Sequence, residues 1–217
     1  DLPGATAMYN NVAALAGSAP PKAWMVGDEP SQTHFSTYRQ VADYLLQQNP
    51  AALRYVNANS SNGDSTLYWG DGSNPSYTYA QYLQDMVTTI RPDVLMYDSY
   101  PFRGNNVTFD NFLFSSLLQV RSTALNNGIP YWTWLQSYSE GNALRLPSES
   151  DLRMQLFAHL AAGYTGFSYY SYSLYPSQDS ALLDANTQPS ALYPIAAAAN
   201  TEARNLGQAL RFLTSTD

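Results

Sequence analysis

Residues 23–30 read Ala-Trp-Met-Val-Gly-Asp-Glu-Pro, a short apolar run that ends in two adjacent carboxylates and a proline. A short apolar run bounded by turn-forming residues is typical of a buried strand. The preceding stretch Ala5–Ala16 predicts a helix, and Ser31 stands where it would cap a following helix. The sequence therefore predicts a strand between two helices, with Asp28 and Glu29 at the strand's carboxyl end.

The same alternation of strand and helix continues along the rest of the chain. Strands are predicted at Ala23–Gly27, Leu53–Asn57, Asp93–Tyr97, Pro130–Leu135 and Gly166–Tyr172, and later helices at residues 31–48, Tyr79–Ile90, Phe109–Leu125, Glu149–Ala162 and Pro189–Leu213, the last with a kink at Pro194. Residues 59–75, rich in Gly, Ser and Asn, predict a long loop. Alternating elements of this kind indicate an α/β fold with parallel strands.

The number of repeating units suggests a barrel that is only partly present. A (β/α)8 TIM barrel has eight strands in about 250 residues, whereas this chain has 217 residues and five predicted strands. We expect one domain, residues 1–217, that forms the C-terminal five or so units of such a barrel and is truncated at the N-terminus. The alternative is a complete doubly wound domain, although no Gly-rich phosphate loop follows its first strand.

Composition excludes several classes of partner. The formal net charge of −7 argues against nucleic acid and against an anionic membrane, since both attract basic surfaces. The chain has no cysteine, and its two histidines match no metal-ligand spacing, so we expect neither a metal nor a cofactor. No apolar run approaches the roughly 20 residues that span a bilayer. Few charges and many Ser, Asn and Tyr residues suggest a secreted protein.

Aromatic and polar side chains gather at the predicted carboxyl ends of the strands. The chain has 18 tyrosines and 4 tryptophans, whose flat apolar faces and polar tips suit stacking on sugar rings. In both α/β architectures this end of the sheet carries the functional site. We expect the substrate-binding residues there to be Asp28, Asn57, Trp69, Tyr100, Trp134, Gln136, Tyr138 and Tyr170.

Residues 24–30, Trp-Met-Val-Gly-Asp-Glu-Pro, resemble the strand-four motif of clan A glycoside hydrolases. That motif ends Asn-Glu-Pro, and Asp28 replaces its Asn here, as in barrel proteins related to the beta-galactosidases. Residues 98–102, Asp-Ser-Tyr-Pro-Phe, are similar to an Asp-Tyr-Tyr-Pro-like stretch of those relatives, and residues 152–170 resemble their last helix and strand. The resemblance implies that Glu29 is the general acid/base.

The strand-seven position departs from the family pattern. Clan A enzymes place a nucleophilic Glu there, but Gln136 follows the run Tyr-Trp-Thr-Trp-Leu at residues 131–135. An amide cannot act as a carboxylate nucleophile, which leaves three readings. Asp98 takes the role as nucleophile or base, Glu140 reaches in from the following loop, or the protein binds sugar without cleaving it.

These observations favour an extracellular glycoside hydrolase that acts on a polysaccharide or oligosaccharide. Glycosidic hydrolysis uses two carboxyl groups that flank one bond. We expect Glu29 and Asp98 to be these catalytic groups, without a metal. The alternative is a non-catalytic carbohydrate-binding barrel. The sequence predicts neither the sugar nor the oligomeric state.

Overall fold

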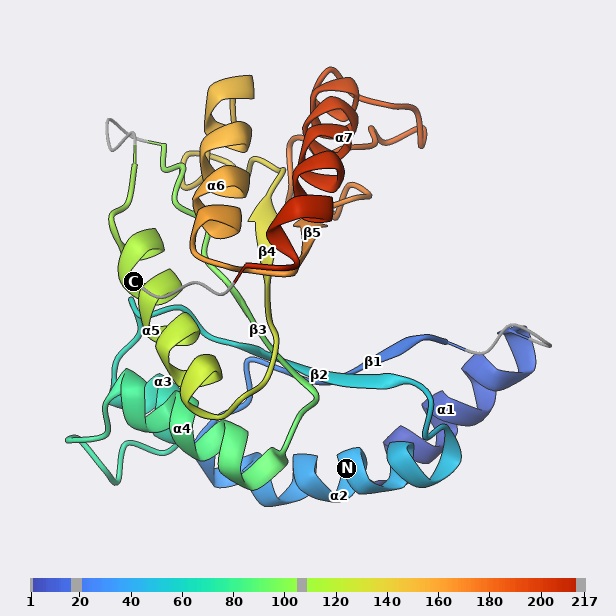
Figure 1. Cartoon of the computed structure of the whole chain (residues 1–217), viewed down its shortest axis with the longest axis vertical. Coiled ribbons are helices and arrows are strands. Elements are labelled where there is room, and N and C mark those ends of the chain that lie inside the picture. The colour runs from blue at the N-terminus through green and yellow to red at the C-terminus, as the bar shows by residue number, and fades with distance from the viewer. Residues whose placement is uncertain (1, 17–20, 105–108, 214–217) are drawn as a thin grey trace. The chain divides into compact units, whose positions relative to one another are not determined.

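The computed structural model describes residues 2–16, 21–104 and 109–213 (Figure 1). Strands and helices alternate as β1 (Ala23–Asp28), β2 (Leu53–Ala58), β3 (Val94–Asp98), β4 (Tyr131–Gln136) and β5 (Gly166–Tyr170), with α1 (Leu2–Ala16), a 3-10 turn η1 (Gln32–His34), α2 (Phe35–Gln48), α3 (Ser65–Trp69), α4 (Tyr79–Ile90), α5 (Phe112–Asn126), α6 (Glu149–Ala161) and α7 (Leu192–Leu210). The predicted α/β class is therefore confirmed.

The strands form a sheet in the order β1-β2-β3-β4-β5, which is also their order along the chain. The ladders β1–β2, β2–β3 and β4–β5 are parallel. In-order parallel strands connected by helices are the arrangement of the β/α units of a barrel, and the structure is consistent with part of one. The chain divides into two compact units, Asp1–Tyr97 with Ser122–Pro130, and Asp98–Arg121 with Tyr131–Asp217.

The first unit contains β1, β2 and the helices α1, α2 and α4. Helix α2 packs against β1, β2 and α4 (Figure 1). Its buried side chains are Phe35, Val41, Ala42 and Leu45, while α4 buries Tyr79, Tyr82, Leu83, Met86, Val87 and Ile90. Their helical spacing produces one apolar face on each helix, and burial of those faces stabilises the unit. Thr78 and Gln81 form a capping box that begins α4.

The second unit is built around β4, β5, α6 and α7. Its core consists of Leu135, Leu152, Leu156, Leu182, Leu192, Ala196, Ala199 and Ala203. The alanines of α7 let its backbone approach α6 (Figure 1). Ser148 accepts a hydrogen bond from the Asp151 N–H, and the Asp151 side chain accepts one from the Ser148 N–H. This capping box fixes the start of α6, as the sequence predicts.

Some element boundaries differ from those predicted. Ser31 occupies the N-cap position of η1, but its side chain makes no capping hydrogen bond, and its Oγ lies 2.8 Å from Nδ1 of His34 instead. Pro194 lies in the first turn of α7, where a backbone N–H has no helical partner, so the predicted kink has no cause there. The predicted loop 59–75 contains α3, whose N-cap is Asp64. In the described part of the chain, no helix is long and apolar enough to span a membrane.

Candidate functional site

The carboxyl ends of β1 and β2 bring three of the predicted residues together. Asp28 pairs with Asn57 in the parallel ladder, and the Asn57 amide donates to Asp28 Oδ1 at 2.9 Å. Asn57 is buried, whereas the side chains of Asp28 and Glu29 are exposed. A register shift between Met25 and Gly27 precedes the two acids. The structure therefore presents both carboxylates to solvent at this end of the first unit.

The backbone of Glu29 is held in the left-handed region, with φ of 45°. Its N–H donates to the Asn57 carbonyl at 2.9 Å, and its carbonyl accepts from the Asn59 amide at 3.4 Å. Asn59 is itself fixed, because Tyr79 donates its hydroxyl hydrogen to the Asn59 carbonyl at 2.6 Å. A non-glycine residue held in this conformation by its surroundings is more common at functional sites than elsewhere.

Asn57 has one polar atom without a hydrogen-bond partner. Its Oδ1 is buried and accepts nothing, although an unpaired buried acceptor costs roughly 1–3 kcal/mol. Its Nδ2 is used by Asp28. Asn57 therefore orients Asp28 from a buried position, and its substrate-binding role stays a prediction.

Trp69 ends α3 and is half-buried. Its indole N–H donates to Ser73 Oγ at 2.7 Å, and its ring packs edge-on against Tyr77 at 4.9 Å. Gly70 follows with φ of 117°, and a Cβ there would come within 2.6 Å of Ser31 Oγ. The absence of a side chain thus lets the loop after Trp69 pack against the segment that follows Glu29.

Asp98 ends β3 in the second unit and is half-buried. The Tyr100 hydroxyl donates to Asp98 Oδ2 at 3.0 Å. This hydrogen bond from the phenol fixes the direction of the Asp98 side chain. Asp98 is therefore an oriented carboxylate and differs from the exposed acids at the end of β1.

Tyr100, the partner of this carboxylate, belongs to a cluster of five aromatic rings. Tyr170, at the end of β5, stacks on Tyr100 with centroids 5.6 Å apart and 23° between the rings. Tyr138 packs edge-on against both, at 5.3 Å in each case. Trp134 meets Tyr170 edge-on at 6.5 Å, and Tyr175 stacks on the same ring at 5.7 Å. Four of the predicted binding residues thus lie together, and Tyr175 joins them.

The tyrosines near Asp98 stay protonated at neutral pH. Burial, followed by the charge of Asp98, holds the pKa of Tyr100 well above its usual value. The pKa of Tyr138 is raised by burial, by the charge of Glu140 and, less strongly, by Tyr170 and Asp98. Both phenols therefore act as hydrogen-bond donors. The charge of Glu140 at Tyr138 also places this acid in the electrostatic environment of the cluster.

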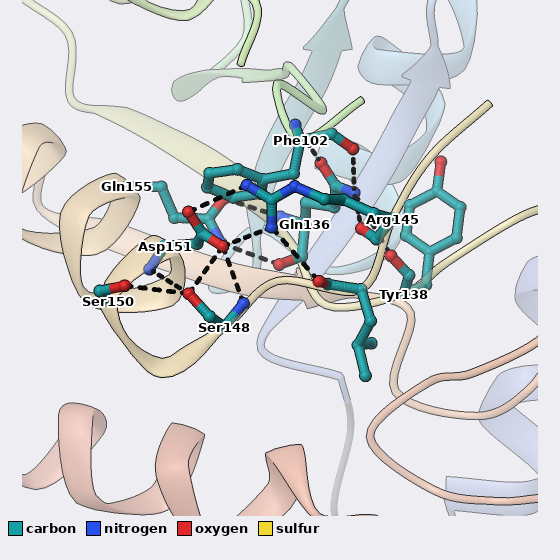
Figure 2. A network of polar contacts seen from close by, with 9 residues as sticks. Phe102, Gln136, Tyr138, Arg145, Ser148, Ser150, Asp151 and Gln155 are labelled. Carbon is teal, nitrogen blue, oxygen red and sulfur yellow. Dashed lines mark hydrogen bonds and ion pairs between the residues drawn. The ribbon is translucent and has the colours of Figure 1, made fainter. Parts of the chain in front are cut away.

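Gln136 lies beside the cluster, but its side chain is turned into the protein (Figure 2). The residue is fully buried. Its Oε1 accepts from the Phe102 N–H at 3.0 Å, and its Nε2 donates to the carbonyls of Phe102, Tyr138 and Arg145 at 3.3, 3.3 and 3.0 Å. All of these partners are backbone atoms and the residue is 0% exposed, so its amide is not open to a sugar, and we leave Gln136 out of the binding set.

A second layer of contacts completes the network around Gln136 (Figure 2). The Gln155 amide exchanges hydrogen bonds with the backbone of Gln136, at 2.9 and 2.8 Å. The guanidinium of Arg145 lies 5.1 Å from the ring centroid of Phe102 and forms an ion pair with Asp151 at 2.5 Å. The network therefore links the segments after β3 and β4 to the start of α6.

The predicted site residues thus fall into groups within each unit. Asp28, Glu29 and Asn57 lie together in the first unit, and Asp98, Tyr100, Trp134, Tyr138 and Tyr170 lie together in the second. Among the described residues, no group of three or more His, Asp or Glu side chains is arranged to hold a metal ion. Sequence reasoning missed Tyr175, for which the only signal is a tyrosine in the loop after the last strand.

Comparison with known proteins adds evidence about the fold. No protein-family model matches the sequence, and comparison with curated protein sequences finds no match. Solved structures do match. The beta-galactosidase from the psychrophilic Marinomonas ef1 superposes with a TM-score of 0.57 at 13% identity over 85% of this chain. The chain spans 30% of that enzyme.

Two further structures show how far this likeness extends. A GH128 endo-beta-1,3-glucanase from Sorangium cellulosum gives a TM-score of 0.53 at 14% identity, covering 88% of this chain and 75% of that one. The carboxyl transferase domain of pyruvate carboxylase from Rhizobium etli gives 0.50 at 11% identity, covering 95% and 31%. The comparisons therefore show a fold that glycoside hydrolases share with an enzyme of other chemistry.

Proposed function

We propose that the protein is a glycoside hydrolase that cleaves O-glycosidic bonds in a polysaccharide or oligosaccharide. One observation carries the proposal: Asp98 is a half-buried carboxylate that a tyrosine orients within a cluster of five aromatic rings, at the carboxyl end of a strand. Oriented carboxylates and aromatic faces are what glycosidic hydrolysis needs. The fold shared with a beta-galactosidase and an endo-beta-1,3-glucanase supports it.

In this proposal Glu29 protonates the leaving oxygen, and Asp98 acts as nucleophile or as base for a water molecule. The backbone hydrogen bonds of Glu29 fix the point from which its side chain starts, and Tyr100 fixes the direction of Asp98. A carboxyl separation of about 5 Å leads to retention of anomeric configuration, and about 6.5–9.5 Å to inversion. NMR of the first-formed product distinguishes the two outcomes.

The remaining polar and aromatic groups would hold the sugar rings. Tyr138 and Tyr170 offer hydroxyl groups, and Trp134 and Trp69 offer half-exposed ring faces. Asp28 is exposed and would bind sugar hydroxyls, while the buried Asn57 would hold its carboxylate in place. Together these groups would stack on the apolar face of a pyranose ring and form hydrogen bonds with its hydroxyl groups, as carbohydrate sites require.

The test is product release from a panel of beta-1,3-glucan, chitin oligosaccharides and galactosides. We expect the wild-type protein to cleave at least one of them, and Glu29→Gln to lose a factor of about 100 or more, as removal of a general acid does. Glu149→Gln changes an exposed acid at the start of α6 and serves as the control, which should cleave at the wild-type rate. Equal rates for Glu29→Gln and wild type would exclude Glu29 as the acid.

Gln136 favours a second candidate, a barrel that binds carbohydrate without cleaving it. The resemblance to clan A enzymes assigns a nucleophilic carboxylate to this position, but the residue here is an amide whose hydrogen bonds go to backbone atoms in a buried network. Binding of a panel glycan by calorimetry, with no product released by the wild-type protein, would establish this function in place of hydrolysis.

A further inference from the structure

Three tyrosine rings form a stack that begins at the Asp98 carboxylate. Tyr100 donates to Asp98, Tyr170 stacks on Tyr100 at 5.6 Å, and Tyr175 stacks on Tyr170 at 5.7 Å, with 23° between the rings in each pair. Because two rings stack on Tyr170, this residue has little ring face left to offer a ligand. The ring available for stacking is therefore the outer one, Tyr175, which Tyr170 separates from Tyr100.

Tyr175 is exposed although it contacts the cluster. Its relative exposure is 51%, whereas Tyr138 is 4% exposed. An aromatic ring with one side packed on protein and the other in water presents a flat apolar surface at little cost in side-chain entropy. Stacking on Tyr170 uses one face of the Tyr175 ring and leaves the residue about half exposed.

The loop that carries Tyr175 is braced by a buried side chain. Gln178 Oε1 accepts from the Tyr175 N–H at 3.2 Å and from the Ser171 hydroxyl at 2.5 Å, and Gln178 is 8% exposed. The Gln178 N–H donates to the Tyr175 carbonyl at 3.0 Å. These bonds fix the backbone on both sides of Tyr175. The ring is therefore positioned before any ligand arrives, which lowers the entropy lost on binding.

We propose that Tyr175 is a stacking platform for a sugar residue of a carbohydrate chain whose neighbouring residues occupy the site at Asp98. This inference rests on the proposed carbohydrate function and names its substrate class: a chain of several pyranose residues. A simple glycoside that fills only the Asp98 cluster does not reach the ring. Each pyranose presents an apolar face of C–H groups that suits an exposed tyrosine.

Tyr172 provides a matched comparison three residues away. It is 54% exposed, close to the value for Tyr175, but its ring lies edge-on to Tyr193 at 6.4 Å. Tyr193 belongs to α7. Replacement of Tyr172 thus removes an equally exposed ring of the same type whose aromatic neighbour lies outside the Asp98 stack.

Calorimetric binding of short and long chains tests the platform. The probes are beta-1,3-gluco-, chito- and beta-1,4-galacto-oligosaccharides of two and six residues, measured in the Glu29→Gln background so that none is consumed. We expect Tyr175→Ala to weaken binding of the six-residue probe about five- to tenfold, which corresponds to about 1.0–1.4 kcal/mol and lies within the range of an aromatic contact. Binding of the two-residue probe should change by less than about twofold.

Three further variants define the outcomes. Tyr175→Phe keeps the ring and should bind like the parent, Tyr175→Gln is a second ringless variant that should match Tyr175→Ala, and Tyr172→Ala should have no effect. Equal affinity of Tyr175→Ala and the parent for the long probe would overturn the platform, as would equal losses for both probe lengths or no binding of any probe. The platform is tested by binding and hydrolysis by product release. A protein that binds glycans without cleaving them would therefore contradict the hydrolase proposal and leave the platform supported.

Discussion

Gln136 shows how the surroundings of one residue decide what its side chain can do. Its Nε2 faces three backbone carbonyl oxygens at 3.0–3.3 Å, and its Oε1 faces a backbone N–H. The surroundings thus offer the side chain one backbone donor and three backbone acceptors. An amide, which both accepts and donates, suits this environment, whereas a carboxylate, which only accepts, does not. The residue therefore positions the segments after β3 and β4, including Tyr138, through their backbones.

Gln136→Glu should destabilise the protein and give no added hydrolysis. At neutral pH a buried carboxylate among carbonyl oxygens is unpaired, and we expect the free energy of unfolding to fall by about 3 kcal/mol or more. The loss should shrink as the pH falls, because protonation turns one oxygen into a donor. Urea unfolding followed by circular dichroism measures it.

Gln40→Glu is the control for this substitution, since Gln40 is exposed on α2. Its effect on the free energy of unfolding should stay within about 0.5 kcal/mol. If Gln136→Glu were as stable as the wild type and hydrolysed glycans faster, Gln136 would be an impaired catalytic position, and the positioning role assigned to it would be wrong.

For the helices, sequence patterns predict those bounds that depend on capping and turn residues close in the chain. Helix α4 has the predicted bounds because Thr78 and Gln81 form its capping box, and α5 ends one residue beyond its predicted end, shortly before Gly128 at φ of 66°. Helix α3 was missed because it has five residues in a loop rich in Gly and Ser, although Asp64 accepts from two of its N–H groups. Short elements of this kind depend on tertiary contacts more than on periodicity.

Helix α6 carries a pH-sensitive residue in its buried face. His159 is 1% exposed, with Nδ1 2.6 Å from the Gln155 carbonyl and its ring edge-on to Tyr164 at 4.7 Å. Burial lowers the pKa of His159 to about 4. The unfolded chain takes up a proton near pH 6.5 and the folded chain does not, so the neutral histidine favours folding fully above that pH and progressively less below it.

We therefore expect the free energy of unfolding to fall by about 3 kcal/mol between pH 7 and pH 4 on account of His159. His159→Asn keeps an N–H donor near the Gln155 carbonyl and lacks the titration, so its stability should depend less on pH over this range. His34→Asn alters the other histidine, which is exposed, and should keep the wild-type dependence. Identical pH profiles for His159→Asn and wild type would contradict the assignment.

For the whole molecule, the alternation of strands and helices was enough to predict an α/β fold of the barrel type, and the comparisons with solved structures support it. The contacts inside the candidate site were only partly predictable. Parallel topology predicts that the polar and aromatic groups at the carboxyl ends of the strands lie at one edge of the sheet. The role of Gln136 does not, because its partners are backbone atoms of Phe102, Tyr138 and Arg145, whose positions depend on the folded loops.

We propose that Glu29 and Asp98 act on the same bond, and a double-mutant cycle on hydrolysis tests this claim most directly. Rates are measured for the wild type, Glu29→Gln, Asp98→Asn and the double variant. Residues that act as one catalytic unit are strongly non-additive. We predict that each single variant loses a factor of about 100 or more and that the double variant is hardly slower than the worse single one. Full activity in either single variant, or losses that multiply, would contradict the claim.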